Sequence, residues 1–145
     1  MSGTVNIGSI TVTSMSAGNI SVGPYTFPST EPVKGSVLVT DGTGNLSFSP
    51  ANTRVEVSAA AHVVAASEDI VAITVAQDTA LTLPDPATKV VGNILYVVKE
   101  AAGAHVVTIA PSGAELISGQ TSHVLSSEYG AAKLYTNGTD WFILT

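Results

Sequence analysis

The side chains with the most chemical potential in this sequence are three histidines. His62, His105 and His123 could serve as metal ligands, but they lie far apart and show no metal-ligand spacing. Three strands would have to bring them together. Cysteine is absent, which excludes a thiolate metal site, a cysteine nucleophile and a disulfide framework. We therefore expect no metal and no cofactor.

A second candidate chemistry is glycoside hydrolysis, which uses a pair of carboxyl groups. Glu68 and Asp69, together with Asp78 or Asp85, are the carboxylates that could form such a pair. All four fall at expected strand ends or turns, where solvated carboxylates are ordinary. We therefore expect no catalytic residue, and the chain is predicted not to be an enzyme.

Two further features could contact a ligand. The segment 42–47, GTGNLS, lacks the third glycine of a dinucleotide fingerprint and the lysine of a Walker motif, so it predicts no phosphate site. Trp141 could stack on a sugar or lie in the core of the last strand. Its apolar neighbours Phe142 and Leu144 favour the core.

Charged residues are scarce, at 11% of the chain, and the formal net charge is −6. Nucleic-acid binding needs clustered lysine and arginine, whereas the five basic residues here are scattered. The N-terminus has no basic segment followed by an apolar core, and no apolar run approaches the ~20 residues of a membrane helix. We therefore expect neither a nucleic acid nor a membrane as a partner.

The elements that would position these side chains are organised around residues 35–48, GSVLVTDGTGNLSF. Apolar residues alternate on both sides of a turn that contains Asp41, Gly42, Gly44 and Asn45. Glycine and asparagine tolerate the positive φ that a tight reversal requires, so the stretch predicts a hairpin. An isolated hairpin is marginal in water. Its apolar side chains therefore need cover from the C-terminal domain or from neighbouring copies of the chain.

Residues 1–30 form an arm without a charged side chain. Apolar residues recur in it at strand spacing, which predicts three or four short strands. The alternative is a flexible Ser/Gly linker. A charge-free, β-prone segment is expected to pack against other protein. The residues expected to make that contact are Val5, Ile7, Ile10, Val12, Ile20, Val22, Tyr25 and Phe27.

The rest of the chain contains short strand patterns at the even spacing of an all-β sandwich. Segment 58–69, SAAAHVVAASED, could instead form about two helical turns because it is rich in alanine. The predicted domains are an arm and connector hairpin at 1–53 and a β-domain at 54–145. Strands are expected at 54–58, 63–66, 70–75, 80–83, 94–99, 106–110, 124–126, 131–136 and 141–144.

Several motifs, in this order, resemble a β-sandwich repeat of tailed-bacteriophage tail-fibre and head-fibre proteins. A connector-like stretch, YTFPSTEPVKGSVLVTDGTGNLSFSP, precedes them, so the resemblance covers residues 25–145. The motifs are TALTLPDPAT, GNILYVVKEA, HVVTIAPSGAELISG and AAKLYTNGTDWFIL.

This resemblance implies a homotrimeric virion protein whose hairpin is followed by an antiparallel, jelly-roll-like β-sandwich. Fibre proteins are long, whereas this chain begins at a methionine and holds one such module, so it looks more like a capsid decoration or cement protein. Such a protein would be made in the host cytoplasm, bind the major capsid protein through its arms, and stabilise the shell from the capsid surface. The alternative is a tail-fibre or head-fibre component that binds a host receptor or glycan.

Overall fold

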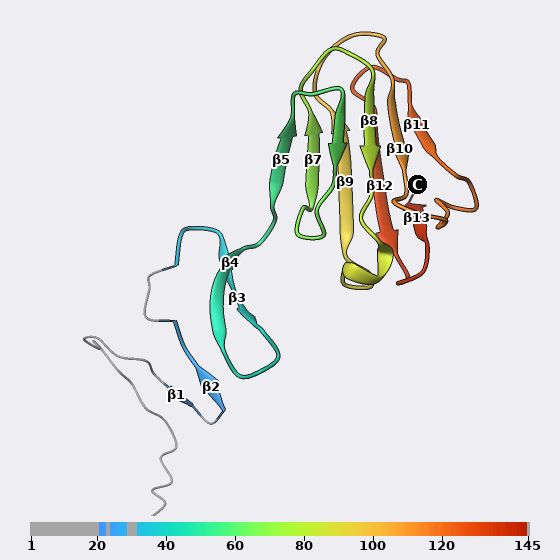
Figure 1. The fold of residues 1–145 in the computed structure, drawn as a ribbon. Coiled ribbons are helices and arrows are strands. Elements are labelled where there is room, and N and C mark those ends of the chain that lie inside the picture. The colour runs from blue at the N-terminus through green and yellow to red at the C-terminus, as the bar shows by residue number, and fades with distance from the viewer. Residues whose placement is uncertain (1–20, 23, 29–31, 145) are drawn as a thin grey trace, which may run out of the picture. The chain divides into compact units, whose positions relative to one another are not determined.

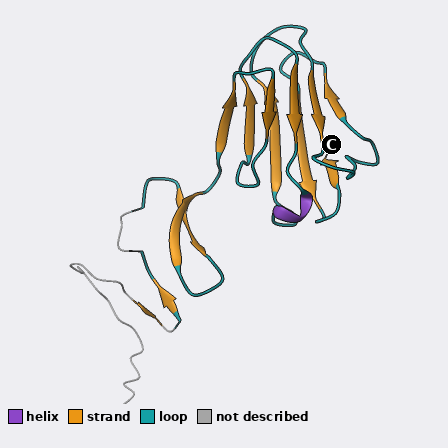
Figure 2. Cartoon of the chain, in the orientation of Figure 1, coloured by secondary structure: helices purple, strands orange, loops and turns teal. Residues whose placement is uncertain are grey.

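The computed structural model of the chain describes residues 21–22, 24–28 and 32–144. It divides into two compact units, Met1–Ala51 and Asn52–Thr145, close to the predicted boundary after residue 53. The regular secondary structure of the described residues consists of β-strands, apart from the short 3-10 helix η1 (Pro86–Thr88) (Figure 2). None of them forms a helix long and apolar enough to cross a membrane. The prediction of an all-β chain is therefore confirmed.

The first unit contains two pairs of short antiparallel strands (Figure 1). They are β1 (Ser21–Val22) with β2 (Tyr25–Thr26), and β3 (Ser36–Thr40) with β4 (Leu46–Pro50). The second pair confirms the hairpin predicted from the sequence. The Thr26 amide donates to the Gly44 carbonyl at 2.9 Å, which ties β2 to the turn of the hairpin.

The second unit contains two sheets, and β9, β12 and β13 have the predicted bounds. The five-stranded sheet has the order β13 (Trp141–Leu144), β12 (Ala131–Thr136), β9 (Ile94–Lys99), β7 (Ile70–Ile73), β5 (Arg54–Val57). The four-stranded sheet has the order β11 (His123–Leu125), β10 (Val107–Ala110), β8 (Thr79–Thr82), β6 (Ala61–Val63). β6 begins before the predicted strand 63–66 and excludes the helical alternative there.

Four strand pairings in this unit are parallel: β5 with β7, β7 with β9, β6 with β8, and β8 with β10. The prediction of an antiparallel domain was therefore wrong, and the parallel pairs also depart from a jelly roll, which is antiparallel. From β5 to β10 the chain changes sheet at every strand, so strands two apart run the same way and become neighbours (Figure 1). Turn residues mark where a chain reverses, but they do not say which sheet the next strand joins.

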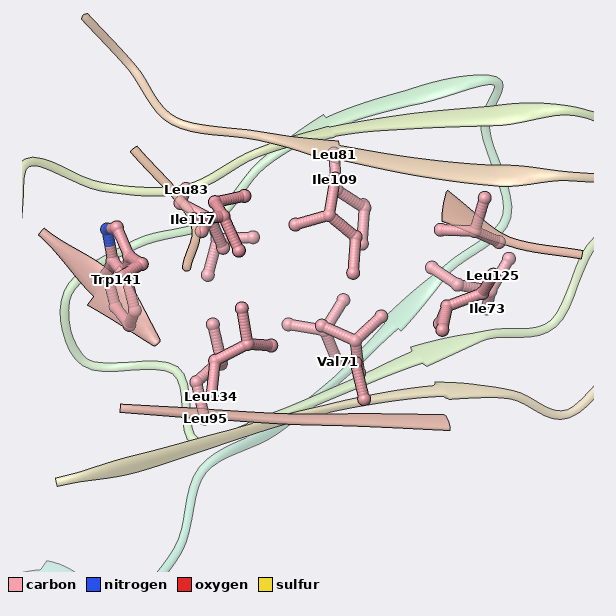
Figure 3. Close-up of a cluster of buried hydrophobic side chains, with 14 of the residues drawn as sticks. Val71, Ile73, Leu81, Leu83, Leu95, Ile109, Ile117, Leu125, Leu134 and Trp141 are labelled. Carbon is pink, nitrogen blue, oxygen red and sulfur yellow. The ribbon is translucent and has the colours of Figure 1, made fainter. Parts of the chain in front are cut away.

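Side chains from both sheets form one apolar cluster (Figure 3). Leu81 and Ile109 of the four-stranded sheet lie opposite Val71 and Leu134 of the five-stranded sheet, and all four are buried. Trp141 lies at one end of the cluster with no exposed surface, and its Nε1–H donates to the Pro84 carbonyl at 3.2 Å. The core position predicted for Trp141 is confirmed.

A lysine is also buried at the end of β9. Lys99 is 1% exposed, and its Nζ donates to the carbonyls of His105 at 2.6 Å and Ser127 at 2.9 Å. Register pairs Lys99 with Ile73, so its side chain points to the core side of the sheet. The ammonium group therefore fastens the loops before β10 and after β11 to the end of the core.

Candidate interaction surface

The structure places the three histidines in different parts of the second unit. His62 lies in β6 and His123 in β11, which are the two edge strands of the four-stranded sheet. His105 precedes β10 and is buried. Within the described ranges, no group of three or more His, Asp or Glu side chains could hold a metal ion. The fold therefore does not assemble the histidines into one site.

Glu68 differs from the solvated carboxylate expected from the sequence, because it is only 8% exposed. Its Oε2 lies 2.9 Å from His62 Nε2. The buried Lys89 Nζ donates to the Glu68 carbonyl at 2.8 Å and lies 3.6 Å from Asp69 Oδ1. These contacts join the chain between β6 and β7 to β6 and to the residue that follows η1. The same contacts give Glu68 and Asp69 structural partners.

The other two carboxylates considered for hydrolysis also bind backbone amide groups. Asp78 Oδ1 accepts a hydrogen bond from the Val106 amide at 2.7 Å, just before β10. Asp85 Oδ1 accepts from the Ala87 amide at 2.9 Å and caps η1. Both side chains are exposed, as the sequence predicts for carboxylates at strand ends. Asp85 stabilises a local turn, whereas Asp78 joins the segment before β8 to the segment before β10.

The four predicted hairpin residues form the turn between β3 and β4. Asp41 Oδ1 accepts hydrogen bonds from the amides of Thr43 at 2.8 Å and Asn45 at 3.1 Å, and Oδ2 accepts from Asn45 Nδ2 at 2.6 Å. These donors favour the ionised carboxylate, and the Asn45 side chain, the largest cause, holds the pKa of Asp41 well below its usual range. Gly42 and Gly44 take positive φ angles of 79° and 101°.

We expect the turn to persist in acid because of this carboxylate. A group whose pKa is depressed by folding stabilises the fold above its unfolded pKa, about 3.9 for Asp, and loses that effect only as pH falls through its folded pKa. An NMR titration of the Asp41 carboxyl carbon should therefore show an ionised group at pH 3. An inflection near pH 4 would show that the turn does not hold the carboxylate as described.

Gly44 is the tightest point of the turn. A Cβ added there would lie 2.3 Å from the Pro24 carbonyl oxygen, whereas nothing lies within 4 Å of a Cβ added at Gly42. Both residues have positive φ. Gly42→Ala therefore measures only the loss of stability that the left-handed backbone conformation causes for a residue with a Cβ, on the order of 1–2 kcal/mol. We expect Gly44→Ala to displace the Pro24 segment as well. Amide exchange at Thr26, which donates to the Gly44 carbonyl, should then accelerate in Gly44→Ala and not in Gly42→Ala.

The hairpin exposes apolar side chains on both of its faces. Leu38 and Phe48 pair across the strands and are 44% and 37% exposed. Val37 and Val39 point to the opposite face, because successive strand residues alternate, and both are also exposed. Solvated strands normally present polar side chains on at least one face. We define these four residues as the hairpin surface.

The structure describes only three of the eight residues predicted for the arm contact. Tyr25 lies in β2 and is exposed, and Phe27 follows it and is half-buried. Val22 lies in β1. The other five, Val5, Ile7, Ile10, Val12 and Ile20, lie outside the described residues.

A second exposed surface, which the sequence did not reveal, lies on the outer face of the five-stranded sheet. Pairing register brings together outward-pointing residues from all five strands. The only sequence signal is alternation within each strand, and it does not say which strands become neighbours. One row across the sheet consists of Leu144, Lys133, Tyr96, Ile70 and Arg54.

The aromatic residues of this face interact with their neighbours. Tyr135 and Phe142, which pair across β12 and β13, stack with ring centroids 5.3 Å apart and planes 26° apart. Lys133 Nζ lies 5.8 Å from the centroid of the Tyr96 ring. We define the outward side chains of Lys133, Tyr96, Tyr135, Phe142 and Leu144 as the aromatic face.

The hairpin surface carries no charge, and the aromatic face carries only that of Lys133. Exposed apolar patches are typical of sites that contact other protein. Comparison with models of known protein families gave no match for this chain. Comparison with curated proteins gave no match either.

Proposed function

We propose that this chain is a structural virion protein of a tailed bacteriophage. It acts as a capsid decoration or cement protein that binds the major capsid protein on the head surface, as a homotrimer, and stabilises the shell. It performs no catalysis and needs no cofactor. The two sheets of its second unit pack as a β-sandwich that projects from the attachment site.

The hairpin surface is the observation that carries this proposal. A two-stranded hairpin with apolar side chains on both faces gains little stability by itself in water. Burying apolar surface contributes roughly 25 cal/mol per Å². Covering both faces with other protein would therefore stabilise the hairpin and also bind it to that protein. Capsid subunits and other copies of the chain are the partners that a decoration protein meets. The second unit has a core of its own and does not depend on that attachment.

The fibre alternative, in which the chain binds a host glycan, has less support. Trp141, the residue considered as a sugar-stacking platform, is buried in the core. The rings of the aromatic face are engaged with each other or with Lys133.

The test uses phage particles that carry variants of this chain. Leu38→Thr combined with Phe48→Thr removes apolar surface but keeps residues that favour strands. We expect this variant to bind particles at least about tenfold more weakly, a change that corresponds to about 1.4 kcal/mol. Val90→Thr, at a 68% exposed position of the second unit, is the matched control and should bind normally.

The experiment also measures the number of copies of this chain on each particle and the resistance of the particles to heat. Hundreds of copies over the head, together with earlier heat disruption when the double variant replaces the wild-type chain, would support a cement role. A few copies at the tail would contradict it and favour the fibre alternative. Deleting residues 1–30 tests the arm in the same assay, with the second unit expected to remain folded. Undiminished decoration by that deletion would refute attachment through the arm.

A further inference from the structure

Two edge strands of the second unit, β5 in one sheet and β6 in the other, differ in how they are protected. The open side of an edge strand can pair with another chain, and charged side chains are one means of preventing this. β5 carries such charges, because the exposed Arg54 forms ion pairs with Glu56 and Glu100. The outward side chains of β6 are Ala61 and Val63, and Val63 is 71% exposed. β6 is therefore an edge without charged protection.

The hydrogen bonds of β6 show which of its backbone groups face the open side. The Ala60 carbonyl accepts a hydrogen bond from β8 at 2.8 Å, and the Val64 amide donates one to β8 at 2.9 Å. Alternate residues of a parallel strand bond to the same neighbour, so His62 bonds to β8 as well. Ala61 and Val63 direct their amides and carbonyls to the other side. No hydrogen bond from another described residue reaches these four groups.

The hairpin has a matching open edge on β3. At the turn, the Asp41 amide donates to the Asn45 carbonyl at 3.2 Å. Hydrogen-bonded and non-hydrogen-bonded pairs alternate along an antiparallel ladder, so the next residue of β3, Thr40, points its backbone groups away from β4. Leu38 does the same. The Ser36 amide, two residues further along, is already bonded within its own turn at 2.9 Å.

The opposite edge of the hairpin is less suited to pairing. Pro50 of β4 has no amide hydrogen to donate. Asn45, just before β4, forms a bridge to β2. β3 is therefore the open edge of the hairpin, and its sequence, SVLVT, is uncharged and contains β-branched residues that favour strands.

We propose that β3 of one copy adds to β6 of the next copy as an antiparallel strand, with Leu38 opposite Val63 and Thr40 opposite Ala61. Antiparallel pairing is slightly more stable per residue than parallel pairing. This register pairs the amides and carbonyls of all four residues, whereas a shift by two residues would require the occupied Ser36 amide or leave groups unpaired. The inference rests on the self-association in the proposed function and names the edges that join the copies.

The register also assigns a role to each face of the hairpin. Leu38 would stand beside Val63 on the outer surface, where Leu38 and Phe48 stay available to the capsid. Val39 would lie opposite His62, which is half-buried and points to the core side of its sheet. The next copy would therefore cover the face of Val39, and the capsid would cover the face of Leu38 and Phe48.

This contact can close into a ring. The two edges are different surfaces, so the contact is head-to-tail, and such contacts form closed rings when the rotation closes. The edges also belong to different units of the chain. The contact therefore does not join two opposite faces of one core, which would stack copies in an open row.

The absence of cysteine from the chain allows a direct test by disulfide formation. Leu38→Cys and Val63→Cys, both at exposed positions, are made singly and together in the full chain. Directly opposite hydrogen-bonded residues have Cα atoms about 5.5 Å apart, which a disulfide spans. After oxidation, a mixture of the two single variants should give dimers of one chain of each kind. The double variant should give covalent trimers and nothing larger.

Two matched controls test the register and the edge. Leu38→Cys mixed with Ala61→Cys joins diagonal positions, about 7–8 Å apart, and should give about tenfold less dimer. Val63→Lys adds a charge to the edge and should weaken self-association about tenfold or more in sedimentation equilibrium. Val90→Lys, at a 68% exposed position of the same unit, should not. Circular dichroism confirms that each variant is folded.

Several results would overturn the pairing. Equal dimer yields from the Ala61→Cys and Val63→Cys mixtures would show that no register is fixed. A disulfide within single chains of the double variant, with no dimer from the mixture, would place both edges in one copy. Products longer than three chains would show an open array, and unchanged association of Val63→Lys would exclude β6.

The pairing and the capsid contact fail separately. The disulfide assay contains no capsid, so its failure leaves the particle-binding experiment on Leu38 and Phe48 unaffected. Loss of particle binding by a chain that still forms the Leu38–Val63 disulfide would reject the capsid contact and leave the pairing of copies standing.

Discussion

Replacing Trp141 with alanine should destabilise the second unit by about 3–5 kcal/mol, the usual cost of truncating a large buried aromatic residue. Trp141 has no exposed surface and lies against the end of the core shared by the two sheets (Figure 3). Its removal leaves a cavity and also leaves the Pro84 carbonyl without the indole donor. Natural domains are stable by only about 5–15 kcal/mol, so the loss is a large fraction of the total.

Chemical denaturation followed by far-ultraviolet circular dichroism measures this loss. Trp141→Phe keeps an aromatic ring and removes the hydrogen bond to Pro84. We therefore expect a smaller loss of stability, of which the hydrogen bond accounts for about 1 kcal/mol. Leu144→Ala, at the exposed end of the same strand, should change the stability least. If Trp141→Ala were no more costly than Leu144→Ala, Trp141 would not be a core residue.

Replacing Lys99 with methionine should cost about 1–3 kcal/mol, because it leaves two carbonyls without their donor at a buried position. Methionine has a similar length and fills the same space, so the change isolates the ammonium group. The carbonyls belong to His105 and Ser127, in loops that the lysine joins to β9. Faster amide exchange in these loops should accompany the loss of stability.

Trp141 is the single tryptophan of the chain, and its buried position makes its fluorescence a probe of unfolding in the Lys99 variant. Lys133→Met is the matched control, since Lys133 is exposed on the neighbouring strand β12. It should change the stability by no more than about 0.5 kcal/mol. Low protein concentration keeps association between copies from contributing. If the two substitutions lowered the stability equally, the hydrogen bonds of the buried ammonium group would not stabilise the fold.

The sequence by itself determined the local structure of this protein. Alternation of apolar residues predicted most of the strands, including β9, β12 and β13 with their bounds. Asp41, Gly42, Gly44 and Asn45 predicted the hairpin turn, because few other residues tolerate its backbone angles. These features depend on neighbours a few residues away, and such neighbours are visible in one sequence. The even spacing of short strand patterns likewise predicted an all-β domain after the hairpin.

Only the tertiary structure decided which strands are neighbours. The chain changes sheet at each step from β5 to β10, and nothing in a short strand states which sheet it joins. That choice made four pairings parallel, buried Lys99 and Glu68, and gathered Tyr96, Tyr135 and Phe142 on one face. A side chain's burial depends on what lies above its sheet, and its partners depend on register between segments far apart in the chain. These are properties of packing, which local propensity and spacing do not encode.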